Sequence, residues 1–374
     1  MLAIIAFLIV LSVLILIHEA GHYFAARMFK VKAEEFGYGL PPRAIGFVRE
    51  NGKWKRVKRG DQNSYKNTIW SINWLPIGGF VRIKGEEGEN KDTDALHARP
   101  VWQRFVIISA GVVMNWVLAA VLLSIGFMIG IPAVLDNLPA GASIDKREVL
   151  IVDTLPGSAA AEGGVQSMDS IVRIGDATPA TVNQAQQLIA EHGTSTMTMT
   201  VRRSGKDVVL TLTPAYIESM EKIALGVSLV DSGRVRYPIH LAIVNGVRIT
   251  GEYTKQVVMS FAGLFHDLFR GGGQTVESVS GPVGIAVLAG KVAEQGILPL
   301  LQFAAILSIN LAVLNFLPIP ALDGGRAVFL IVEAIRRKPV KRDVEAIIHN
   351  VAFLLLIVLI ILITVRDVTR MFGW

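Results

Sequence analysis

Four strongly apolar stretches constrain what this chain can fold into. A helix needs about 20 residues to cross roughly 30 Å of hydrocarbon. The chain combines a mean hydropathy of +0.48 with only 18% charged residues, against about 25% in soluble domains. We therefore predict a polytopic α-helical membrane protein with four spans; buried core helices are the alternative. The stretches are Leu2–Ile17, with a helical pattern continuing through His18–Met28, Phe105–Pro132, Ile297–Leu317 and Val351–Val365.

The first apolar stretch is expected to be retained. A secretory signal peptide begins with basic residues and ends at a small-residue cleavage site. No Lys or Arg lies between Met1 and Ile17, and no such cleavage site precedes the charged motif that follows.

The distribution of Lys and Arg predicts the orientation of the spans, because cytoplasmic loops carry more of these residues than translocated ones. The segment 26–104 holds 16 of them, and the connection after the third span is also rich in them. The longer segment 132–296 holds 13. We therefore predict that both basic segments are cytoplasmic, and that 132–296 and both chain termini lie outside.

The motif His18-Glu19-Ala20-Gly21-His22 directly continues the first stretch. Residues four apart lie on one face of a helix, one turn from each other, so the two imidazoles can share a metal ion. The chain has no cysteine, so a metal would be held by His, Asp or Glu. This is the H-E-x-x-H pattern of zinc metalloproteases, with Glu19 placed to act on a zinc-activated water. A structural polar cluster at the end of a span is the alternative, although such groups are costly there.

A catalytic zinc site needs a third protein ligand and one open position. Asp323 is the best candidate, because it follows two prolines and precedes two glycines near the predicted cytoplasmic end of the third span. Non-helical backbone at membrane depth is tolerated where it is buried or lines a wet cavity. The alternative is an Asp paired only with Arg326. The other histidines, which we do not favour as ligands, are His97, His192, His240, His266 and His349.

The predicted cytoplasmic segment 35–86 is rich in Gly, aromatic and β-branched residues. We predict hairpins against the membrane face, in which Gly78, Gly79 and Phe80 form a strand edge that takes a substrate as an extra strand. A purely structural hairpin is the alternative.

The outer segment contains a small α+β module between about residues 149 and 214. Its turn at 156–160, its D-x-I-x-x-I-G strand and the helix and hairpin behind them resemble a PDZ domain. Such domains bind peptides by adding them to a sheet edge, and a module that only spaces or shields is the alternative. The predicted strands are 149–152, 169–174, 196–202 and 208–213, with a helix at 182–191.

Together these motifs resemble the site-2 protease family, and most closely the bacterial regulator of sigma-E protease group. The resemblance rests on H-E-A-G-H after a first span, N-F-L-P-I-P-A-L-D-G-G at a third, and the PDZ-like insert between the second and third. It implies one zinc ion per chain, held by His18, His22 and Asp323, with Glu19 as general base. It also implies that Asn315 helps to hold substrate or the developing oxyanion; a backbone cap at the broken helix is the alternative.

The resemblance also implies a location and partners. We expect a multi-pass protein of the bacterial inner membrane that cleaves the transmembrane segments of single-span proteins, such as anti-sigma factors, or signal-peptide remnants. Some members of the group carry two PDZ domains, whereas the outer segment here has room for one. The PDZ-like module is expected to take a peptide ligand, and no nucleic acid is expected as a partner.

The predicted fold is a four-span site-2 protease core with cytoplasmic β-hairpins and an inserted α+β PDZ-like domain. An amphipathic helix at 253–270 is expected on the outer membrane surface. The predicted parts are a first span with H-E-x-x-H (1–30), a membrane-associated hairpin region (31–104), a second span (105–132), the PDZ-like domain (139–232), a membrane-associated region (233–296), a third span with the L-D-G-G motif (297–326), a basic connection (327–348) and a fourth span (349–367).

Three other function classes compete with this prediction. A non-catalytic membrane scaffold would use only the PDZ-like module to capture peptides. A metal-dependent transporter would also place His, Glu and Asp in the membrane, but no inverted repeat is visible. Nucleic-acid binding could follow from the net charge of +6, although the basic run at 53–59 is better suited to anionic headgroups.

Overall fold

The computed structural model describes residues 2–58, 61, 65–86, 92–135, 138–203, 205–217, 222–270 and 281–372. Part of the predicted region 233–296 therefore lies outside the described residues. The chain divides into two compact units. The first comprises 1–122, 247–293 and 303–374, and the second comprises 123–246 and 294–302.

In the described part of the chain, four helices are long and apolar enough to cross a membrane. The prediction of four spans is thereby confirmed. The helices are α1 (Leu2–Met28), α2 (Val101–Ile129), α7 (Ile297–Phe316) and α9 (Arg342–Phe372). α9 begins seven residues before the predicted fourth span, because the charged residues at its start continue the same helix.

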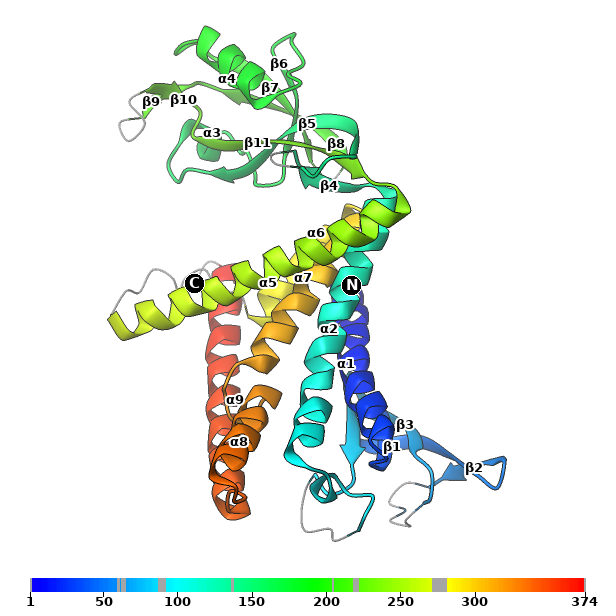
Figure 1. Ribbon diagram of the computed structural model, residues 1–374. Helices are drawn as coiled ribbons and strands as arrows, with labels where there is room; N and C mark the ends of the chain where they lie inside the picture. Colours follow the sequence, from blue (N-terminus) through cyan, green and yellow to red (C-terminus); the bar gives the residue numbers. More distant parts are fainter. Residues whose placement is uncertain are drawn as a thin grey trace. The chain divides into compact units, whose positions relative to one another are not determined.

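Helices α1 and α2 run side by side at close range (Figure 1). A Cβ atom on Gly21 of α1 would lie 2.4 Å from the carbonyl oxygen of Ala110 in α2. Only a glycine lets the two backbones approach so closely. α1 ends where Lys30 adopts a φ of 58° and the N–H of Val31 bonds back to the carbonyl of Ala26 at 2.8 Å.

The predicted hairpin region forms one three-stranded sheet, in the order β2-β1-β3. The strands are β1 (Ala33–Glu50), β2 (Lys53–Val57) and β3 (Ile69–Ile83). β3 has two arms: 79–83 pairs with 33–38 of β1, and 69–73 pairs with 43–48 of β1, while 69–72 also registers with 35–38. Both arms belong to one continuous strand, which bends between them.

The sheet packs against α1 over much of the length of that helix. The bend of β1 near Tyr38 reaches as far as Ser12 of α1. The hydroxyls of Tyr38 and Ser12 lie 3.1 Å apart. Across the bend in β1, Arg43 pairs with Glu35, whose side chain is only 4% exposed. The sheet thus lies along the same helix that carries the two histidines.

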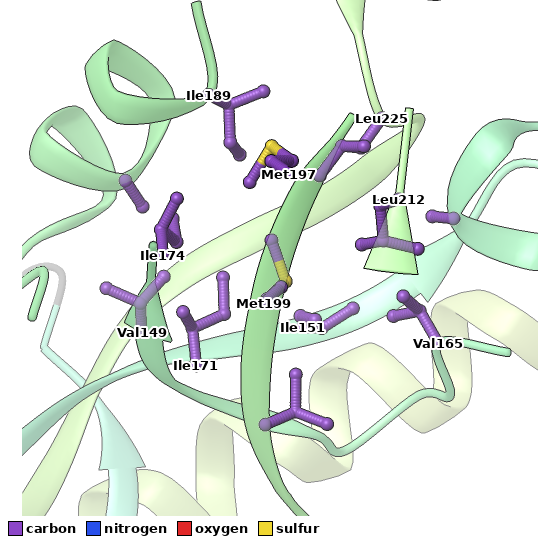
Figure 2. Packing of buried hydrophobic residues seen from close by; sticks show 13 residues of the cluster. Val149, Ile151, Val165, Ile171, Ile174, Ile189, Met197, Met199, Leu212 and Leu225 are labelled. Carbon is purple, nitrogen blue, oxygen red and sulfur yellow. The ribbon is translucent and has the colours of Figure 1, made fainter. Parts of the chain in front are cut away.

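The second unit is built around a six-stranded sheet, in the order β4-β11-β5-β6-β7-β8. Its core is formed by inward-facing side chains, among them Ile151, Ile171 and Met199, that meet on one side of the sheet (Figure 2). The elements are β4 (Ile131–Val134), β5 (Ser143–Thr154), α3 (Ala159–Glu162), β6 (Ser170–Ile174), α4 (Val182–Glu191), β7 (Met197–Arg203), β8 (Lys206–Leu212), β9 (Ala215–Ile217), β10 (Lys222–Ala224) and β11 (Val227–Arg236).

Every element that the sequence predicted between 149 and 214 has a counterpart in this unit. The sequence prediction missed the short pair β9 and β10 and also β4 and β11, which add two strands beyond β5. The pattern of β11 is broken by Asp231, Ser232 and Gly233, so it does not alternate as a strand should. One of these residues has a local role, because the Asp231 carboxylate accepts the N–H of Val182 at the start of α4 at 2.7 Å.

In the described part of the chain, four further helical segments accompany the four apolar helices and the helices α3 and α4 of the second unit. The predicted amphipathic stretch 253–270 is the second half of a longer helix, α5, which begins at Ile239. The others are the short 3-10 turn Leu96–Ala98, α6 (Pro282–Glu294) and α8 (Asp323–Arg336).

Candidate metal centre

His18 and His22 lie one helical turn apart in α1 and point toward each other. Their Nε2 atoms are 3.2 Å apart, and the two residues are 7% and 8% exposed. Both positions fall inside the uninterrupted helix that the apolar sequence dictates. The motif therefore gives the geometry that its spacing predicts.

Asp323 reaches the same point from the first residue of α8. Its Oδ2 lies 3.0 Å from Nε2 of His18 and 3.4 Å from Nε2 of His22. α7 ends at Phe316, and the turn that follows folds its carbonyls onto the start of α8. A Cβ atom on Gly324 would lie 2.2 Å from the carbonyl oxygen of Leu317. The glycine after Asp323 is thus what lets α8 start here.

The three ligand atoms fit a zinc ion. In a tetrahedral site with metal–ligand bonds of 2.0–2.1 Å, neighbouring ligand atoms lie about 3.3 Å apart. The separations here are 3.0, 3.2 and 3.4 Å. The Nδ1 of His22 donates to the carbonyl oxygen of Ile107 at 2.9 Å, so the neutral ring presents the lone pair of Nε2 to the Asp323 carboxylate. A cation between these atoms removes that repulsion.

Gly111 of α2 leaves room for the two imidazoles. A Cβ atom there would lie 2.4 Å from Nε2 of His22 and 2.8 Å from Nε2 of His18. Such contacts are far below the van der Waals range, so any larger residue would displace the ligands. The sequence analysis did not single out Gly111, because its role depends on how α2 is rotated against α1.

Asn115, one turn further along α2, is fully buried against His18. Its Nδ2 lies 3.4 Å from Nδ1 of the imidazole, and its Oδ1 has no hydrogen-bond partner among the described residues. The two amide atoms can be exchanged by a flip of the side chain. Oδ1 then accepts the Nδ1 proton and leaves Nε2 of His18 free for a metal. Asn115 was not singled out from the sequence; its position as a polar residue within an apolar span is the signal that could have pointed to it.

Glu19 lies at the same centre and is held by the sheet. Its Oε2 accepts the N–H of Val81 in β3 at 2.9 Å. Both residues, with the three candidate ligands, line a cavity of about 230 Å³. The apolar side chains of Phe80 and Leu96 form part of its wall together with the charged side chains of Glu86 and Arg326, and the cavity offers an open position next to the ligands.

The remaining predicted site residues have different surroundings. Phe80 lines the cavity, whereas Gly78 and Gly79 lie in β3 beside Ile15 and Leu16 of α1. Asn315 is half-buried in the last turn of α7 and is not in the described lining of the cavity. Among the described residues, the only group of three or more His, Asp or Glu side chains arranged to hold a metal is His18, His22 and Asp323.

Comparison with known proteins points the same way as this geometry. The family described as Peptidase family M50 matches residues 6–57 and 61–359. A protein of Brucella suis named as a zinc metalloprotease is 30% identical over 377 residues, covering 94% of this chain and 91% of the relative. One of Clostridium acetobutylicum is 31% identical over 359 residues, with coverages of 96% and 94%. The regulator of sigma-W protease RasP of Bacillus subtilis is 27% identical over 451 residues, with 99% of each chain covered.

Proposed function

Because this chain belongs to peptidase family M50, a family of zinc-dependent membrane proteases, we propose that His18, His22 and Asp323 are its zinc ligands and that Glu19 is its general base. The protein is a zinc metalloprotease of the regulated intramembrane proteolysis family. The assignment of roles rests on one observation, the convergence of three ligand atoms within 3.4 Å of one another beside Glu19.

The chemistry divides between the metal and the side chains. Bound zinc supplies Lewis-acid activation of a water nucleophile. The N–H of Val81 holds Oε2 of Glu19, which leaves Oε1 to take the proton of that water. Glu19 then passes the proton to the amide nitrogen as the peptide bond breaks, so that one water is consumed and an acid and an amine are formed.

The substrates we propose are the transmembrane segments of single-span proteins, including anti-sigma factors, and signal-peptide remnants. RasP is by name a regulator of a sigma factor, which supports the first class. A helical substrate has all its backbone groups bonded internally, so the cleaved segment must unwind and find new partners. The arm of β3 around Gly78, Gly79 and Phe80 would provide them by strand addition.

Two observations support this strand edge. The arm 79–83 pairs with β1 on one side, and Phe80 and Val81 line the cavity that contains Glu19. In the alternative, the arm serves only to hold Glu19 through Val81. Asn315 is proposed as an oxyanion or substrate contact on its position eight residues before Asp323 alone.

The proposed location is the bacterial inner membrane. The basic segments 26–104 and 326–342 support a cytoplasmic placement for the loops that flank the metal centre. The same rule puts the second unit and both chain termini outside the cytoplasm.

The second unit is proposed to be the PDZ-like, peptide-binding domain. β4 registers with residues 232–235 of β11, so among the described strands none registers with 227–230 on that side. α4 begins beside this edge, where Asp231 caps its first N–H. An extended peptide could add to β11 there; a module that only spaces or shields is the alternative.

A paired zinc and cleavage measurement tests the assignment. We expect Glu19→Gln to keep about one zinc per chain by elemental analysis and to lose cleavage of a transmembrane substrate in nanodiscs by at least about 1,000-fold. Asp323→Ala should lose both, while Asp343→Ala, an exposed Asp at the start of α9, should change neither.

Two outcomes would contradict the proposal. Normal turnover by Glu19→Gln would remove the general base, and full zinc content in Asp323→Ala would remove the third ligand. A chain that binds peptides but shows no zinc-dependent cleavage would favour the scaffold alternative.

A further inference from the structure

The turn that carries Asp323 contains a strained residue. Ala321 has a φ of 82°, in the left-handed region that residues with a Cβ avoid. Such a conformation persists only where the surroundings hold it. Ala321 lies two residues before Asp323, so its backbone angles help to set where that carboxylate lies.

His349 of α9 contacts this turn at the strained position. Its Nδ1 accepts the N–H of Ala321 at 2.7 Å. The ring of Phe329 in α8 lies against the same imidazole, with ring centroids 5.9 Å apart. The imidazole therefore touches the chain on both sides of Asp323, before it in the turn and after it in the helix.

The protonation pattern of His349 supports a specific purpose for this contact. Because Nδ1 accepts, the neutral ring carries its proton on Nε2. That Nε2 is buried and has no hydrogen-bond partner among the described residues. An unpaired buried N–H is unfavourable, and an apolar side chain would avoid it. The bond to Ala321 is the compensating interaction.

We propose that His349 is a positioning residue of the metal centre: its bond to Ala321 holds the left-handed turn that sets the Asp323 carboxylate against His18 and His22. The inference rests on the proposed role of Asp323 as a ligand. Metal–ligand distances tolerate only about 0.2 Å of change, so a relaxed turn weakens zinc binding. α9 contributes to the metal centre in this way without providing a ligand.

The test is the zinc dissociation constant of detergent-purified protein, measured by competition with a chelator. We expect His349→Leu to weaken zinc binding about 10–100-fold, the usual effect of losing a group that orients a ligand. His349→Asn should stay within about 3-fold of wild type, because the Asn oxygen occupies the place of Nδ1 and accepts the same N–H. Asn350→Leu, at an exposed neighbouring position of α9, is the matched control and should not change the constant.

The thermal midpoint of the zinc-free protein separates positioning from folding. Under the inference, His349→Leu and Asn350→Leu unfold at similar temperatures without zinc and differ only in zinc affinity. The inference is overturned if His349→Leu binds zinc as wild type does, or if His349→Asn binds as weakly as His349→Leu. Asp323→Ala distinguishes a failure of the ligand assignment from a failure of the positioning role. Normal zinc affinity in Asp323→Ala overturns the ligand assignment. Loss of zinc binding in Asp323→Ala together with normal zinc affinity in His349→Leu overturns the positioning role alone.

Discussion

Replacing Gly111 by alanine is the smallest change that should disable the metal centre without replacing any of the three ligand residues. The added Cβ would lie 2.4 Å from Nε2 of His22 and 2.7 Å from Cε1 of His18. Ordinary contact between such atoms begins at about 3.4 Å, so one imidazole or the helix backbone must move by about 1 Å. A retreat of α2 would relieve this clash only by opening the close packing between Gly21 of α1 and the carbonyl of Ala110.

A shift of that size has a calculable consequence. Zinc sites tolerate about 0.2 Å in ligand distance, and a misplacement of about 1 Å costs about 100-fold in catalysis. We expect zinc affinity and cleavage each to fall by at least about 100-fold, equivalent to about 2.8 kcal/mol. Overpacking also lowers the free energy of unfolding, by about 1–3 kcal/mol.

The assay compares Gly111→Ala with Gly251→Ala, a helical glycine of α5 whose added Cβ meets nothing within 4 Å. Zinc affinity is measured by chelator competition, cleavage with a transmembrane substrate, and folding by the thermal midpoint of each zinc-free variant. The control should match wild type in all three. If Gly111→Ala binds zinc within about 3-fold of wild type, then α2 does not lie against the two imidazoles. That result would refute the reasoning from the short distances between Gly111 and the two histidines.

Two further predictions concern groups around the centre and in the sheet. Asn115→Leu should weaken zinc binding about tenfold, because it removes the acceptor for Nδ1 of His18. The control is Asn310→Leu, which should not change zinc binding, because the Asn310 amide bonds to a carbonyl of its own helix. Equal zinc dissociation constants for the two variants in chelator competition would contradict this prediction. Burial alone would raise the pKa of the Glu35 carboxyl, but the hydrogen bonds and the charge of Arg43 hold that pKa below its usual range. The stability that this carboxylate contributes is therefore present above a pH of about 4.5 and is lost as the pH falls through the lowered pKa of the folded state. In zinc-free protein, the thermal midpoint of Glu35→Gln should therefore fall less between pH 6 and pH 3 than that of wild type.

The parts of this structure that could be predicted from sequence are those fixed by local periodicity. Four apolar helices follow from hydropathy, and the one-turn spacing of His18 and His22 follows from the helix itself. Asp323 could be found because prolines and glycines break the helix beside it. The strands of the second unit alternate clearly between 149 and 213, so the four strands β5 to β8 were predicted.

The rest depends on how distant elements pack, which no local pattern encodes. The roles of Gly111 and Asn115 depend on the rotation of α2 against α1, and the bond of Glu19 to Val81 depends on the register of β3 along the same helix. His349 has no sequence signal of this role, because its spacing from Asp323 along the chain indicates no contact between the two segments. Its bond to Ala321 joins residues 28 positions apart and arises only when α9 packs on the turn.

These contacts show that a helix without a ligand can set the geometry of a metal centre. Ile107, Gly111 and Asn115 follow one another at intervals of four along one face of α2. The first orients one imidazole, the second leaves room for both, and the third faces Nδ1 of the other. The carbonyl of Asn115 also accepts the buried hydroxyl of Ser308 at 2.8 Å, which ties this face of α2 to α7, the helix that leads into the turn before Asp323. A displacement of α2 would therefore be felt by all three ligands, through a side chain, a backbone or the neighbouring helix in turn.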